Sequence, residues 1–193
     1  MQPDPGNSPS RTMTLEAFAD TLVPGEQRFP GDRAIAGAAP GPGAVAAGAI
    51  ELLETPATGV TDGLDNYVQA LNAHAVAYAT EHGLGQDASV PPFVALSFAD
   101  RTTLVKTLTG KTPAGLDHPE KDLWVLLALF CFMAFDTAAH MHTVDAIASG
   151  HPGLATMKFA KPDADGLWRF ADYSYRRPLA RIHPDTIPSG SLP

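Results

Sequence analysis

Histidines are the side chains in this sequence best suited to acid–base or metal chemistry. They are His74, His82, His118, His140, His142, His151 and His183. His140 and His142 cannot face one ion on a helix, because positions two apart differ by about 200°. Asp136 shares a helical face with His140, and such a carboxylate can orient an imidazole or form half of a metal site. A satisfied polar pair near a helix end explains the same spacing, as it does for His142 and Asp145. Without a third ligand, the sequence predicts no metal site.

A second group of polar side chains follows one side of a helix predicted over residues 62–82. Stacked phenol and imidazole groups could line a ligand pocket and supply a general acid or base. The same stripe is typical of a half-buried helix face whose polar tips reach water. If a pocket exists between this helix and the one predicted over 119–149, its polar members are Tyr67, His74, Tyr78, Asp136 and His140.

No nucleophile has a visible activating partner. Cys131, the single cysteine, lies in an apolar run where a thiol stays protonated and inert, and it has no partner for a disulfide. There is no G-x-S-x-G motif, and the glycine clusters at 41–43 and 83–85 lack the residues of a phosphate loop. The sequence therefore predicts no catalytic residues and no cofactor bound by this chain.

The elements that position these residues are predicted to be helices. Helical patterns begin near Thr14 and cover residues 44–54, 62–82 and 97–108, and no segment alternates like a strand. The strongest pattern covers about 119–149, where the thirteen residues 123–135 are apolar on all sides. That length is too short to span a membrane but suits a helix buried within a bundle. We expect an all-α, single-domain helical bundle around this buried central helix, with a long Pro/Gly-rich connection over 24–43.

Composition limits the possible classes of function. The chain has 193 residues and a net charge of −8, which disfavours nucleic-acid binding. No segment reaches the roughly 20 apolar residues of a membrane span. The N-terminus lacks the basic and apolar regions of an export signal and lacks a twin-arginine pair. We expect a soluble, cytoplasmic protein with no membrane or nucleic-acid partner.

The expected organisation is a flexible leader over 1–12, a helical domain over 13–157 and an extended C-terminal arm over 158–193. Residues 158–181 carry six basic residues against three acidic ones, whereas the rest of the chain carries seven against eighteen. The arm also contains aromatic residues, which disordered tails usually lack. It could pack on its own acidic domain or on a partner, since Arg, Tyr and Trp are enriched at interface hot spots.

Four short segments together resemble a known family. They are FADTLVPG at 18–25, FPGD at 29–32, SGHPGL at 149–154 and PDADGLW at 162–168. The first two are similar to the opening of the gluconate 2-dehydrogenase subunit 3 family, and the last two to an actinobacterial branch of it. These are small helical subunits that accompany flavin-dependent dehydrogenases of the glucose–methanol–choline type. The resemblance implies an accessory role, no catalytic residues in this chain, and FAD in the partner.

The sequence therefore favours a non-catalytic small subunit that stabilises a larger flavin-dependent oxidoreductase. The expected docking segments are Pro24–Gly43 and Gly166–Arg177, with anchors at Trp168, Tyr173, Tyr175, Arg176 and Arg177. The alternative is a free-standing small-molecule enzyme, such as an isomerase or cyclase, or a ligand-binding protein that uses the pocket described above.

Overall fold

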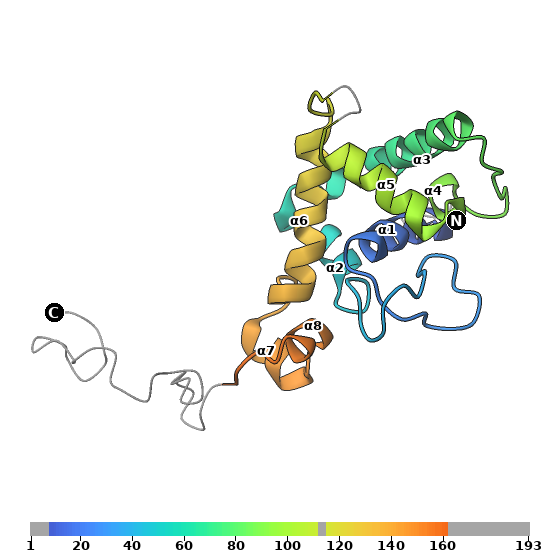
Figure 1. Cartoon of the computed structure of the whole chain (residues 1–193). Helices are drawn as coiled ribbons and strands as arrows, with labels where there is room; N and C mark the ends of the chain where they lie inside the picture. Colours follow the sequence, from blue (N-terminus) through green and yellow to red (C-terminus); the bar gives the residue numbers. More distant parts are fainter. Residues whose placement is uncertain (1–7, 112–114, 162–193) are drawn as a thin grey trace, which may run out of the picture. The chain divides into compact units, whose positions relative to one another are not determined.

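The computed structural model describes residues 8–111 and 115–161, and this part of the chain is helical (Figure 1). The helices are α1 (Pro9–Leu22), α2 (Ala49–Leu53), α3 (Leu64–Glu81), α4 (Pro92–Ala95), α5 (Phe98–Thr109), α6 (Lys121–Thr137), α7 (Thr143–Ser149) and α8 (Pro152–Thr156). Two 3-10 turns, η2 (Pro56–Thr58) and η3 (Thr61–Gly63), precede α3. No strand occurs in the described residues beyond one isolated bridge between Lys111 and Asp117. The predicted all-α class is confirmed.

The chain divides into two compact units, Met1–Phe159 and Ala160–Pro193. All eight helices belong to the first unit, and only residues 160–161 of the second are described. Among the described helices, none is long and apolar enough to cross a membrane.

Helix α1 occupies the centre of the bundle and contacts α2, α3, α4, α5 and α6. It begins at Pro9, earlier than the start predicted near Thr14, so residues 9–12 are helical rather than part of a leader. Ser8 caps the helix by accepting a hydrogen bond from the Arg11 N–H, and Pro9 fits the first helical position, where no N–H partner is needed.

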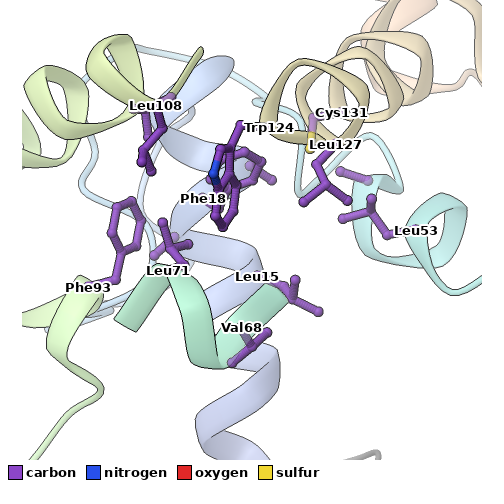
Figure 2. Close-up of a cluster of buried hydrophobic side chains, with 14 of the residues drawn as sticks. Leu15, Phe18, Leu53, Val68, Leu71, Phe93, Leu108, Trp124, Leu127 and Cys131 are labelled. Carbon is purple, nitrogen blue, oxygen red and sulfur yellow. The ribbon is translucent and has the colours of Figure 1, made fainter. Parts of the chain in front are cut away.

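The main hydrophobic core joins α1 to helices α2–α6. Its largest fully buried side chains include Phe18 of α1, Phe93 of α4 and Trp124 of α6. The rings of Phe18 and Trp124 lie 6.1 Å apart, and Leu127 and Cys131 continue the buried side of α6 toward α2 (Figure 2). Burial raises the pKa of the Cys131 thiol to about 12, so it stays protonated as predicted.

Helix α6 differs from the prediction in length and in burial. The helix predicted over 119–149 is divided, because Ala138 adopts a left-handed conformation (φ 51°) that ends α6, and α7 begins only at Thr143. One side of α6 is exposed, and the central position, in contact with five other helices, belongs to α1 instead. No Gly or Pro lies between residues 120 and 149 to mark the division. Ala138 is fully buried against Ala146 and Leu154, so tertiary packing accounts for the break.

The long connection before α2 is fixed by the buried Arg101 of α5. Arg101 is 4% exposed, and its guanidinium donates hydrogen bonds of 2.6–3.1 Å to backbone carbonyls. The acceptors are the carbonyls of Arg33, Ala34, Val94 and Leu96. One cation therefore joins the connection to the segment that precedes α5.

Two buried carboxylates fix the same connection from other directions. Asp20 of α1 accepts hydrogen bonds from the backbone N–H groups of Gly25 (3.0 Å) and Ala36 (2.8 Å). Asp32 accepts from the N–H groups of Ala34 and Ile35. Burial raises the pKa of Asp20 more than its hydrogen bonds lower it. The pKa of Asp32 is lowered overall, because hydrogen bonds from Arg28 and the backbone outweigh burial.

Candidate functional site

The outer face of α6 carries an unusual set of exposed apolar side chains, which we call the α6 stripe. Its members are Val125, Leu126, Leu129 and Phe132, each between 38% and 49% exposed. They lie within two helical turns, on the side opposite Trp124, Leu127 and Cys131. Contiguous exposed apolar residues on a globular protein are typical of an interaction site.

A groove of about 440 Å³ runs beside this stripe, between α5 and α6. Ala128 and Val105 contribute apolar surface, and Leu22 contributes from the end of α1. The α5 side also carries Lys106, which is exposed and for which the described residues offer no ion-pair partner. An apolar groove with one wall formed by an exposed helix suits the apolar face of a partner segment.

A second, more polar groove of about 310 Å³ lies between α3 and α5. It is lined by imidazole, phenol, hydroxyl and carboxylate groups beside Leu104 and Leu108. The polar residues are His74, Tyr78, Glu81, His82, Thr103, Thr107 and His118. The Tyr78 and His82 rings stack with centroids 4.0 Å apart. The Tyr78 hydroxyl donates to Asp100 at 3.2 Å, and burial together with this carboxylate raises the pKa of Tyr78.

Glu120 connects this groove to the main core. One carboxylate oxygen, Oε2, lies 2.9 Å from His74 Nε2 and accepts a hydrogen bond of 3.1 Å from the Trp124 indole N–H. The hydrogen bond with His74 lowers the pKa of Glu120, despite the opposite effect of burial. The His118 ring lies edge-on to His74, with centroids 5.4 Å apart. These groups could bind a small polar molecule, but His74 Nε2 and Glu120 Oε2 already form a hydrogen bond with each other.

The five residues predicted to form a pocket do not lie together. His74 and Tyr78 line the α3–α5 groove, while Tyr67 lies beside Gly63 at the edge of the main core. Asp136 is exposed near the end of α6, and His140 follows α6 and packs on Gly48. The groove also lies between α3 and α5, not between α3 and the predicted helix over 119–149. Glu120 was not among the predicted site residues, although its position four residues before Trp124 on a helix indicates their contact.

The division between α6 and α7 also changes the predicted histidine pairs. Asp136 and His140 are no longer on one helical face, because α6 ends at Thr137. His142 precedes α7 as its N-cap residue and is exposed. Within residues 8–111 and 115–161, no group of three His, Cys, Asp or Glu side chains could hold a metal ion.

The predicted docking segments are only partly visible. Pro24–Gly43 is described and exposes Phe29, with the Arg28 guanidinium 5.9 Å from the centre of its ring. Gly166–Arg177 lies outside the described residues, as do the predicted anchors Trp168, Tyr173, Tyr175, Arg176 and Arg177.

Comparison with known proteins places the chain in a family but gives no nearer relative. A search of the curated proteins finds no match, and neither does a search of the solved structures. The family model of DUF5987, a family of unknown function, matches residues 9–193. This match begins at the first residue of α1 and includes all the described helices, so the chain belongs to the DUF5987 family.

Proposed function

We propose that this protein is a non-catalytic accessory subunit that binds and stabilises a larger flavin-dependent oxidoreductase through the α6 stripe. The observation that carries the docking role is the stripe itself, with the adjacent apolar groove. The class of partner rests on the resemblance to the gluconate 2-dehydrogenase subunit 3 family. FAD and the substrate chemistry belong to the partner in this proposal.

The energetics of the stripe favour a binding role over a folding role. Its four side chains remain 38–49% exposed, so covering them on association would remove further apolar surface from water. Each Å² covered contributes about 25 cal/mol, before the cost of association is subtracted. A partner bound only in its folded form is stabilised by mass action, as expected of an accessory subunit.

The test is co-expression with a flavin-dependent oxidoreductase from the same genome, followed by co-purification and measurement of the thermal stability and turnover of that enzyme. We expect Leu129→Ser with Phe132→Ser to weaken the complex by about 30-fold or more, as for hot-spot residues. Val76→Ser is the matched control, since Val76 of α3 is 42% exposed and does not line the groove. A flavoprotein equally stable and active without this chain would contradict the proposal.

A second candidate function is that of a small-molecule enzyme or ligand-binding protein, favoured by the polar α3–α5 groove. His74, Tyr78 and His82 of that groove could orient a small polar ligand. The test is to record histidine NMR signals of the isolated chain during a screen of small polar compounds. Saturable shifts of His74 and His118 that disappear in Tyr78→Ala would support this function, whereas an unresponsive groove would dismiss it.

A further inference from the structure

The segment from Ala138 to Phe159 buries few apolar side chains against the rest of the first unit. Ala138, Ala146 and Leu154 form a separate buried cluster, with Ile147 packed against it. Helix α8 also approaches α6 so closely that a Cβ atom at Gly153 would overlap the carbonyl oxygen of Phe135. Because this contact buries so few apolar side chains, its polar groups strongly affect whether the contact forms.

His151 is one of those polar groups and is only 4% exposed. Its Nε2 lies 3.0 Å from the carbonyl oxygen of Ala47, and its Nδ1 accepts a hydrogen bond of 3.4 Å from the Leu154 N–H at the start of α8. A neutral ring with its proton on Nε2 satisfies both contacts. A second proton, on Nδ1, would face the Leu154 N–H and remove the hydrogen bond that caps α8.

His140 is the other polar group. Its ring occupies the space beside Gly48, where a Cβ atom would overlap the ring atoms Cε1 and Nε2. Its Nδ1 is buried, and the described residues provide it with no hydrogen-bond partner. The His140 and His151 rings lie 5.6 Å apart, so protonating both would place two positive charges side by side.

We propose that His140 and His151 form a pH-sensitive clasp, which holds α7 and α8 against α6 and the turn that precedes α2 when both rings are neutral and releases them under mildly acidic conditions. Opening would uncover Ala138, Ala146 and Leu154, and the end of α6 next to the α6 stripe. The clasp does not depend on what binds that stripe.

The direction of the pH effect follows from the surroundings of His140. Burial lowers its pKa, nearby His151 lowers it further, and Glu51 of α2 acts in the opposite sense. An opened, hydrated histidine has a pKa of about 6.5. Above that pH both states are neutral and the clasp has its full stability. As the pH falls below 6.5, the open state binds protons that the closed state does not, so closure weakens until the lower pKa of the closed state is reached.

The test uses the full chain in amide hydrogen exchange between pH 7.5 and pH 5, with each rate divided by the intrinsic rate at that pH. We expect opening of residues 143–157 to increase by up to about tenfold per pH unit for each histidine whose protonation requires opening. Protection of α1 and α3 should change much less. A pH-independent opening constant for residues 143–157 would overturn the clasp.

Two variants distinguish the effect of protonating His140 from general effects of acid on the protein. His140→Phe keeps a ring beside Gly48 but cannot bind a proton, so the acid-induced increase should fall by at least threefold at pH 5.5. His142→Phe, at an exposed position two residues away, should retain the wild-type response. The wild-type chain gives a further readout by NMR, in which His140 should titrate below the ordinary histidine pKa of about 6.5. Titration of His140 at or above that pH, or a full acid response in His140→Phe, would refute the proposal.

Discussion

The two hydrophobic clusters of the described chain differ in size and in the contacts that hold them. The main core contains 24 buried apolar residues drawn mostly from α1–α6, whereas the cluster beneath α7 and α8 contains three. Large side chains such as Trp124 and Phe18 interlock in the first, and mostly alanine fills the second. The small cluster therefore depends on a close backbone approach at Gly153 and on two imidazoles, both of which small changes can disrupt.

This difference indicates how stability is distributed along the chain. Proteins open locally where few apolar contacts are buried, at a lower free energy than global unfolding requires. We therefore expect α7 and α8 to open independently while α1–α6 remain folded. Four substitutions test whether the two clusters unfold separately.

Removing the largest side chain of the main core should destabilise the whole first unit. Trp124 is 1% exposed, so Trp124→Ala leaves a large cavity and should lower the free energy of unfolding by about 3–5 kcal/mol. Urea denaturation followed by circular dichroism measures this change. Val125→Ala, at a 43% exposed position on the same helix, should change stability by no more than about 0.5 kcal/mol. Similar losses in both variants would contradict the described orientation of α6.

Removing the buried cation should weaken the main core at its edge. Arg101→Met leaves four backbone carbonyls without their donor, and we expect a loss of about 3 kcal/mol in the free energy of unfolding. Faster amide exchange at Gly25 and Ala36 should accompany it, without extra opening of α7 and α8. Arg33→Met is the control: Arg33 pairs with Asp87 in an exposed ion pair, typically worth about 0–1 kcal/mol. Equal effects of the two substitutions would show that the four hydrogen bonds of Arg101 do not stabilise the fold.

Adding one methyl group at Gly153 should disrupt only the small cluster. The new Cβ would overlap the Phe135 carbonyl oxygen, so Gly153→Ala should raise the opening constant of residues 143–157 by about tenfold or more. The free energy of global unfolding should fall by no more than about 1 kcal/mol. Hydrogen exchange and urea denaturation measure the two effects separately. Gly85→Ala is the control, because a Cβ atom at Gly85 would meet no atom within 4 Å beyond its two chain neighbours. A global loss as large as that of Trp124→Ala would show that the two clusters unfold together.

The smallest effect is expected where a polar group lies at the edge of the main core. Tyr78→Phe removes the hydroxyl that donates to Asp100 but keeps the ring that stacks on His82. We expect a loss of about 0.5 kcal/mol in the free energy of unfolding, measured by thermal denaturation. The pH dependence of α7 and α8 opening should not change. A loss above about 2 kcal/mol would place Tyr78 within the core rather than at its edge.

Periodicity and end signals were sufficient to predict several helices. Leu64, Val68 and Leu71 form the buried side of α3, and Gly83 follows its end, close to the predicted limits of 62–82. Ser97 caps α5 at the start of the helical pattern predicted over 97–108. The division of α6 could not be predicted in this way, because alanine at 138 carries no local signal for a left-handed conformation. The partners of His74 and His140 also could not be predicted, since Glu120 and Gly48 are far from them in sequence.

The order of apolar and polar residues by itself determined the helical class, the positions of α3 and α5, and the protonated state of Cys131. These properties depend on residues close together in the sequence, so the spacing of apolar and polar residues is enough to predict them. Tertiary structure decided that α1 is central, that α6 leaves one side exposed, and that His140 and His151 meet. A helix that is apolar on all sides can pack through any of them. The neighbouring helices therefore decide which side of α6 remains exposed, and the sequence of α6 cannot specify it.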